Sequence, residues 1–316
     1  MTEKQINKWL RRQFSPVGWT LIGFGTLMNL LVMVTMGVDL ARQALWNVST
    51  GNFLTDFDWN TVWNNGWGYI AANVTIFVIL VGWKGKGYWG RILKRKAQRM
   101  NVRTVFTMMC LSVGAQFLNS LWIMGLEWIS SLFGSSVMPV LESVSGASDS
   151  FSMFLYGAVF APVAEELLFR GFVLESLRPY GKRFAILTSA ILFGAFHGNL
   201  LQAPYAFVMG LLLGYLATEY SLKWAIGLHL FNNLILAEGL TRLTEQLPVM
   251  LADGIFSGLF LICSILSVVI LVRNRSVIRQ YRENAWIDRR CMKCFFTSFG
   301  VLAVLLSAIV SMISYM

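Results

Sequence analysis

Charged residues are scarce in this sequence. Aspartate, glutamate, lysine and arginine make up 13% of the 316 residues, whereas a soluble protein carries about 25%. Hydrophobic residues account for 56%, and the mean hydropathy is +0.60. This composition excludes an ordinary soluble domain and predicts an all-α protein, a polytopic bundle of transmembrane helices.

Acidic residues are fewer than basic ones, 16 against 26, which gives a net charge of +10. Such an excess could serve nucleic-acid binding, but the lysines and arginines lie in the gaps between apolar runs, as the positive-inside rule requires. With a cytoplasmic N-terminus, every basic residue except Arg42, Arg170 and Arg242 falls on the cytoplasmic side. We therefore expect a multi-pass protein of the cell membrane with its C-terminus outside, in contact with lipid and not with nucleic acid.

Cysteine is rare as well, with four residues in the chain. Cys110 and Cys263 lie in apolar runs, where we expect small core residues. Cys291 and Cys294 form a single CxxC, whereas a structural zinc site usually needs a second ligand pair. The pattern favours an incidental pair at the membrane interface over a metal or redox site.

The apolar runs predict about nine spans, or eight, because the fifth and sixth runs are short for the roughly 20 residues that a crossing needs. A basic N-terminal segment closed by Pro16 precedes the first. The predicted spans are 17–37, 66–83, 104–126, 151–177, 184–197, 205–220, 224–240, 255–272 and 294–315. We divide the chain into an N-terminal three-span region (1–150), a core (151–240) and a C-terminal two-span region (241–316).

The fourth run contains three charged residues, Glu165, Glu166 and Arg170. Each charge near the centre of a bilayer costs about 2.5–3.5 kcal/mol on insertion scales, so the cluster indicates a functional site. Glu166 and Arg170 are four residues apart, in the favourable order for a helical ion pair. Glu165 has no partner at such a spacing, and a spare carboxylate suits general-base chemistry. The alternative is a purely structural cluster that holds helices together.

Histidine is scarcer still, with two residues, His197 and His229, both in apolar runs. Histidines in membranes usually face a cavity or the helix bundle. Asn233 follows His229 by about one helical turn, so its amide and the imidazole could together stabilise an oxyanion. Asn232 should point about 60° away from His229. Counting residues from the cytoplasmic ends places Glu165 and His197 about 20 Å deep but His229 only about 9 Å deep. We expect a tilted or late-starting seventh helix to bring these residues together.

Three ordered motifs resemble those of a known family. They are Glu165-Glu166-x-x-x-Arg170, Phe193-x-x-x-His197 and His229-x-x-x-Asn233. Each motif alone is weak, but the ordered set resembles the CPBP intramembrane proteases, the CAAX protease and bacteriocin-processing (ABI) family, which includes the type II prenyl-protein endopeptidases. The resemblance covers roughly residues 150–240 and implies a CPBP-type core with an endopeptidase site inside a helical bundle.

The resemblance also implies roles for single residues. Glu165 matches the glutamate that activates water, and Glu166 and Arg170 match its supporting pair. His197 matches a histidine that holds the water or a metal. The remaining pair, His229 and Asn233, matches the residues that face the peptide oxyanion.

The need for a metal is left open by the sequence. The family carries a metalloprotease label, and Glu165, His197 and His229 are residue types that would ligate zinc. However, the HExxH pattern is absent, and a metal-free mechanism with a carboxylate and a water molecule uses the same residues.

Two function classes remain. The first is an intramembrane endopeptidase that cleaves membrane-associated proteins or peptides. The second is a non-catalytic membrane partner, such as a bacteriocin-immunity or regulatory protein that retains the fold. Intact ionisable positions favour the enzyme, because a scaffold need not keep groups that are costly to insert. The short loops look bacterial and argue against a eukaryotic-type prenylated substrate.

Overall fold

The computed structural model describes residues 1–50, 57–95, 97–144, 148–283 and 287–314. Every regular element in these ranges is a helix. Five helices or continuous helical runs are long and apolar enough to cross a membrane: Glu3–Ser49, Trp59–Lys84, Val102–Leu132, Phe151–Tyr180 and Val249–Arg273. A sixth crossing results if Arg289–Phe296 and Phe299–Ser314, bent by 63°, form one span. The chain is a multi-pass membrane protein, and the predicted number of nine spans is not confirmed.

A helix nevertheless lies at each predicted span position. The difference in number comes mainly from short helices in the core: α10 (Lys182–Phe196) has 15 residues and α11 (Ala203–Glu219) has 17. At 1.5 Å per residue these extend about 22–26 Å, less than the roughly 30 Å of bilayer hydrocarbon. Short helices of this kind complete a bundle without each crossing the whole membrane.

The N-terminal helix is longer than predicted. Helix α1 runs unbroken from Glu3 to Ser49, through Pro16 and through much of the polar segment that follows the first span. The prediction that Pro16 closes a separate segment is wrong. A proline is tolerated inside a membrane helix where neighbouring helices satisfy the freed backbone groups. Here α17 (Phe299–Ser314) packs beside it, and the Gly300 N–H donates to Ser15 Oγ at 3.0 Å.

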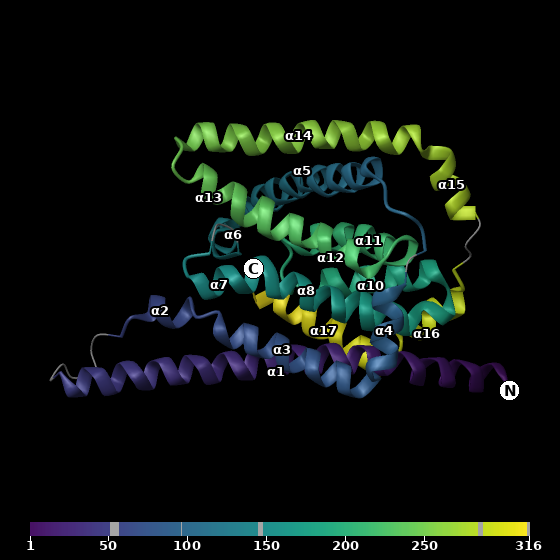
Figure 1. Ribbon diagram of the computed structural model, residues 1–316, viewed down its shortest axis with the longest axis horizontal. Helices are drawn as coiled ribbons and strands as arrows, with labels where there is room; N and C mark the ends of the chain where they lie inside the picture. Colours follow the sequence, from purple (N-terminus) through teal and green to yellow (C-terminus); the bar gives the residue numbers. More distant parts are fainter. Residues whose placement is uncertain (51–56, 96, 145–147, 284–286, 315–316) are drawn as a thin grey trace.

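The helices form layers around one central run (Figure 1). That run consists of α7 (Phe151–Leu155), the π-helix η1 (Tyr156–Phe160), α8 (Ala161–Glu166), the π-helix η2 (Leu167–Leu174) and α9 (Glu175–Leu177). Helices α10, α11 and α12 (Leu222–Leu230) pack around it. Helices α1, α3 (Trp67–Lys84) and α17 cover one side, and α5 (Val102–Leu132) and α14 (Val249–Arg273) cover the other.

The remaining elements are short. They are α2 (Trp59–Trp63), α4 (Lys86–Lys94), α6 (Met138–Val144), the 3₁₀-helix η3 (Arg178–Tyr180), the π-helix η4 (Phe231–Leu240), α13 (Thr241–Thr244), α15 (Arg275–Glu283) and α16 (Arg289–Phe296).

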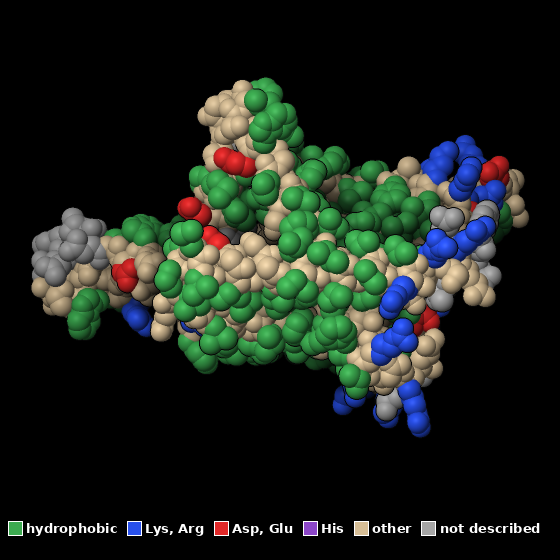
Figure 2. All heavy atoms as spheres, turned by 90° about the horizontal axis from the view of Figure 1, so that it is seen from above, with side chains coloured by type: hydrophobic (Ala, Val, Ile, Leu, Met, Phe, Trp, Pro, Cys, Tyr) green, Lys and Arg blue, Asp and Glu red, His purple; other side chains and the backbone are tan. Residues whose placement is uncertain are grey.

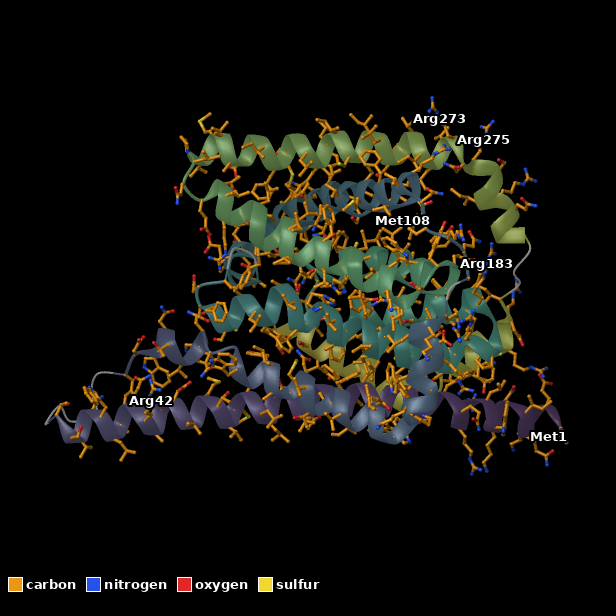
Figure 3. All side chains as sticks on the ribbon, in the orientation of Figure 1. Met1, Arg42, Met108, Arg183, Arg273 and Arg275 are labelled. Carbon is orange, nitrogen blue, oxygen red and sulfur yellow. The ribbon has the colours of Figure 1, made fainter. Side chains whose placement is uncertain are left out.

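Charge is distributed unevenly along the bundle. Lysine and arginine side chains gather at one end of the molecule, and apolar side chains cover the middle (Figure 2). Met1, Arg183, Arg273 and Arg275 lie at that end, whereas Arg42 lies at the opposite end (Figure 3). The basic residues that the positive-inside rule assigns to one side of a membrane thus gather at one end of the bundle.

Glycines allow α1 and α17 to touch through their backbones. A Cβ atom on Gly18 would lie 2.0 Å from the carbonyl carbon of Gly300, so the two helices would have to separate. Small residues at such contacts are typical of membrane helices, whose association depends on close packing.

We therefore expect Gly18→Ala to lower the free energy of unfolding by about 1–3 kcal/mol, the usual cost of overpacking. Gly23→Ala is the matched control on the same helix, because a Cβ atom there meets nothing within 4 Å. Thermal unfolding of both variants in detergent tests the contact. Equal melting temperatures would contradict it.

Candidate active site

The helix that carries the first motif changes its winding twice. Helix α8, with Glu165 and Glu166, lies between the π-helices η1 and η2, and Arg170 lies in η2. π-Helical segments, with i→i+5 hydrogen bonds, are rare and occur frequently at functional sites. A third π-helix, η4, carries Asn232 and Asn233. Side-chain directions in these segments therefore differ from those of a regular α-helix.

Glu166 and Arg170 form an ion pair that is fully buried. Arg170 Nη1 donates to Glu166 Oε1 at 2.7 Å, and both side chains are 0% exposed. Arg170 Nη2 also lies 3.4 Å from the Gly210 carbonyl oxygen on α11. Its guanidinium stacks on the Phe193 ring, 4.4 Å from the ring centroid. The pair therefore joins the first-motif helix to α10 and α11.

His229, at the end of α12, lies between the two glutamates. Its Nδ1 is 2.9 Å from Glu166 Oε1 and its Nε2 is 3.8 Å from Glu165 Oε2. A carboxylate oxygen only accepts hydrogen bonds, so Nδ1 carries the hydrogen. The Glu165 side chain remains 21% exposed, while that of His229 is 7% exposed. The first and third motifs thus meet, although counting residues from the ends of the predicted spans placed His229 nearer the cytoplasmic surface than Glu165.

His197 is set apart from this cluster by one aromatic ring. It caps the C-terminal end of α10, and its Nδ1 is 2.9 Å from the Phe193 carbonyl oxygen. The Phe193 ring contacts both histidines, with centroids 4.9 Å from His197 and 5.8 Å from His229. Phe193 therefore orients His197 through its carbonyl and separates the two imidazoles through its ring.

The two asparagines of η4 are bonded to each other. Asn232 Nδ2 donates to Asn233 Oδ1 at 3.0 Å, and Asn233 Nδ2 donates to the Gly157 carbonyl oxygen at 3.1 Å. The Tyr205 hydroxyl on α11 donates to Asn232 Oδ1. Sequence analysis did not identify Tyr205, since its distance of 27 residues from Asn232 gives no local signal. Helical spacing alone suggested that Asn232 points away from Asn233 and acts independently of it. The hydrogen bond between the two side chains shows instead that they are coupled.

Helix α4, near the end of the bundle that is rich in lysine and arginine, contacts the first-motif helix at Gly171. The Tyr88 hydroxyl donates to the Gly171 carbonyl oxygen at 2.8 Å, and a Cβ atom on Gly171 would lie 2.6 Å from the Trp89 ring. Burial, together with the negative charge of Glu175, raises the pKa of Tyr88 to about 12, so the hydroxyl stays protonated and able to donate. Glu175 itself pairs with Arg95 and Arg178.

The arrangement does not fit a metal ion. Within the described part of the chain, no group of three or more histidine, cysteine, aspartate or glutamate side chains could hold one. His229 Nδ1 is engaged by Glu166, and His197 contacts Phe193 instead of joining Glu165. Cys291 and Cys294 are buried free thiols that belong to no such group. We therefore derive no step that uses a metal.

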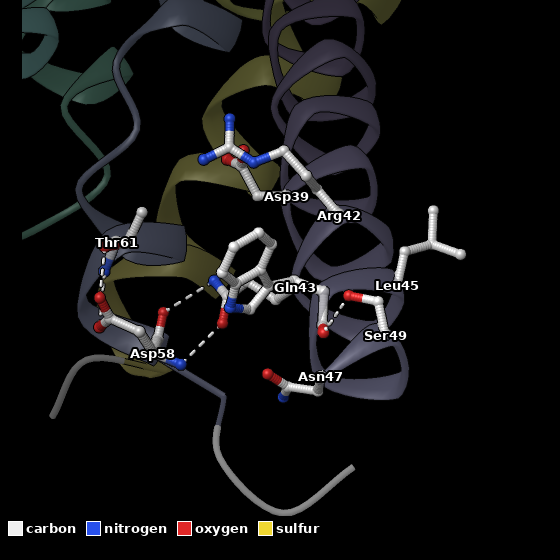
Figure 4. Close-up of a pocket in the computed structure, with 9 residues that line it drawn as sticks. Asp39, Arg42, Gln43, Leu45, Asn47, Ser49, Asp58 and Thr61 are labelled. Carbon is white, nitrogen blue, oxygen red and sulfur yellow. Dashed lines mark hydrogen bonds between the residues drawn. The ribbon is translucent and has the colours of Figure 1, made fainter. Parts of the chain in front are cut away.

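A hollow of about 710 Å³ lies elsewhere, between the end of α1 and α2. Figure 4 shows its lining, which includes Asp39, Arg42, Gln43 and Asp58. None of the motif residues lines it, and the Asp58 backbone N–H donates to Gln43 Oε1 at 2.7 Å. It is a polar crevice separate from the site.

Comparison with known proteins gives one match. A family model described as type II CAAX prenyl endopeptidase Rce1-like matches residues 147–235. The matched segment contains all three motifs. No curated protein and no solved structure is significantly similar to the chain.

The buried ion pair gives a first test of the site. We expect Glu166→Ala to lower the free energy of unfolding by roughly 3–5 kcal/mol, because it leaves Arg170 charged and unpaired in a dry interior. Glu165→Ala should cost much less, since that side chain is half-buried and lies 3.8 Å from its histidine. Yield and melting temperature of the two variants provide the measurement. Equal losses would show that Glu166 and Arg170 do not act as a stabilising pair.

Proposed function

We propose that this chain, whose residues 147–235 form a domain of the CAAX protease-like family, is an intramembrane endopeptidase. It would hydrolyse peptide bonds of membrane-associated proteins or peptides. The observation that carries the proposal is the contact of one half-exposed carboxylate, Glu165, with a histidine whose other nitrogen bonds to a buried ion pair.

Glu165 is the group that would activate water. It is the only one of the two adjacent glutamates with an exposed side chain, 21% against 0% for Glu166. A carboxylate in a largely apolar site can take a proton from water as the water oxygen attacks the peptide carbonyl carbon. The same proton then passes to the leaving amine nitrogen, so that Glu165 is regenerated as a carboxylate.

His229 is the first residue that would stabilise the oxyanion. Its Nδ1–H is held by Glu166 at 2.9 Å, and its Nε2 lies 3.8 Å from Glu165 Oε2. With a hydrogen on Nε2 as well, the imidazole would donate to the oxyanion as negative charge develops on the carbonyl oxygen.

Asn233 offers a second donor. An asparagine amide carries two N–H groups, and one of them is used by the Gly157 carbonyl oxygen. The bond from Asn232 to Asn233 Oδ1 and the bond from Tyr205 to Asn232 fix the direction of the amide. The second N–H would then stabilise the same oxyanion as His229.

The decisive experiment compares Glu165→Gln with the unaltered chain. The full chain is reconstituted in lipid vesicles and offered a set of quenched fluorescent peptides with apolar C-terminal segments, with and without a prenylated cysteine. We expect cleavage of at least one peptide, hereafter the reporter peptide. Glu165→Gln should lose about 10²–10⁴-fold in turnover, the usual contribution of a general base.

Glu175→Gln is the matched control, because it makes the same change further along the same helical run, at a residue that pairs with Arg95 and Arg178. It should retain turnover. If the intact chain cleaves no peptide, or if Glu165→Gln cleaves as fast as the control, the enzyme proposal fails. The first outcome would favour a non-catalytic immunity or regulatory partner.

A second prediction concerns the oxyanion donors. Asn233→Ala should lower kcat by about 10²–10³-fold, the cost of one such donor elsewhere, and leave KM nearly unchanged. Asn232→Ala removes the bond that orients Asn233 and the acceptor of the Tyr205 hydroxyl but no donor to the oxyanion, so we expect a loss of less than about tenfold. Steady-state kinetics on the reporter peptide tests both. A larger loss of kcat in Asn232→Ala than in Asn233→Ala would mean that Asn232, and not Asn233, donates to the oxyanion.

A further inference from the structure

Helix α3 lies outside the family domain, yet one of its faces lies against the first-motif helix. This face is a stripe of residues spaced by three or four positions: Tyr69, Asn73, Ile76, Leu80 and Trp83. Residues at that spacing share one side of an α-helix. The stripe is therefore one surface, and its two ends show what it touches.

Both ends of the stripe touch the helical run that carries Glu165. The Tyr69 ring stacks on Tyr156, with centroids 4.7 Å apart and an interplanar angle of 28°. At the other end, the Trp83 ring lies 5.3 Å from Phe172. The two contacts run in the same order along both helices, so Asn73 lies at a level between Tyr156 and Phe172. The same stretch of the run contains Glu165.

The contact between Tyr69 and Tyr156 also connects α3 to the helical run that carries Glu165. The Tyr156 phenol stacks on Tyr69, and Tyr156 precedes Glu165 by nine residues in the same helical run. Asn73 follows Tyr69 by four residues, about 6 Å further along α3 in the direction of Glu165. Helix α3 therefore carries Asn73 on the face that packs against the first-motif helix, about one helical turn beyond the Tyr69–Tyr156 contact.

Asn73 carries a buried donor with no partner. The residue is 5% exposed, and its Nδ2 makes no hydrogen bond to any described residue. A polar group left unpaired in an apolar interior costs free energy, and lipid offers no acceptor in place of water. Such a group persists when it is needed for a ligand that satisfies it.

We propose that Asn73 is a substrate-binding residue whose amide donates to a backbone carbonyl oxygen of the bound peptide. This inference rests on the proposed endopeptidase function and names a contact for its substrate. A peptide that enters the membrane in a cleavable, unwound form exposes carbonyl oxygens that have no donor in lipid. Binding beside Asn73 satisfies both the carbonyl oxygen and the amide.

The proposal predicts opposite effects on stability and on substrate affinity. In the free protein the unpaired amide destabilises the fold, so Asn73→Leu should raise the melting temperature by about 2–4 °C. The loss of one hydrogen bond to substrate should raise KM for the reporter peptide about five- to tenfold, with kcat within about twofold. A structural asparagine would instead lower the melting temperature when replaced.

The experiment measures melting temperature, KM and kcat for Asn73→Leu and for Asn73→Val, which keeps the test open if the first variant folds poorly. Asn119→Leu is the matched control, because Asn119 also has an unpaired amide atom but lies on α5. Helix α5 packs mainly against α11 and α14. The control should leave KM unchanged.

A second arm replaces single carbonyl groups of the reporter peptide by methylene groups. One replacement should weaken binding to the unaltered chain and have no effect on Asn73→Leu. An unchanged KM or a lowered melting temperature would overturn the inference. So would a fall in kcat at constant KM, which would mean that Asn73 holds the attacking water. In each of these cases cleavage by the unaltered chain leaves the proposed function standing, whereas a complete lack of cleavage rejects the function itself.

Discussion

The buried contact of Glu166 with Arg170 is the constraint on which the rest of the site depends. Two opposite charges at 2.7 Å with fully buried side chains are tolerable only while both remain in place. Glu166 also accepts from His229, and Arg170 reaches the Gly210 carbonyl oxygen. Four helical segments, α8, η2, α11 and α12, must therefore keep their relative positions for these contacts to persist. Glu165 lies beside this cluster, and its side chain is 21% exposed whereas that of Glu166 is fully buried.

Close backbone packing makes that cluster geometrically feasible. Gly210 and Gly214 on α11 have GxxxG spacing, and a Cβ atom on Gly210 would lie 2.8 Å from the Cα atom of Ala190. The approach of α11 to α10 brings a carbonyl oxygen within reach of Arg170. Gly171 acts similarly on the other side, where it admits the Trp89 ring. In a membrane the hydrophobic effect does not drive helices together. Small residues at these contacts let the helices approach closely, and van der Waals packing then stabilises their association.

Local spacing in the sequence predicted some of this geometry, and tertiary contacts decided the remainder. The pairing of Glu166 with Arg170 followed from their separation of four residues, because side chains at that spacing are neighbours on one face of a helix. The asparagine pair could not be predicted in the same way, since η4 is a π-helix and Tyr205 comes from another helix. The same limit applies to Pro16, which lies inside α1 while the residues beside it, Ser15 and Gly18, contact Gly300 of α17. A span count from hydropathy also treats every apolar run as a full crossing, which the 15 residues of α10 do not support.

The depth of His229 shows most clearly why residue counting failed. Counting assumed that the turn between α11 and α12 lies at the membrane surface, so that a histidine seven residues beyond it would be shallow. Instead Tyr220 and Ser221 in that turn are only 8% and 6% exposed. The segment after α4 covers them, and the Ala97 N–H donates to the Tyr220 carbonyl oxygen at 3.1 Å. The third motif therefore starts from a turn that the rest of the protein covers. The charged groups of the site lie within residues 147–235, which the family model matches, while α4 and Ala97, outside that segment, contact the helices that carry them.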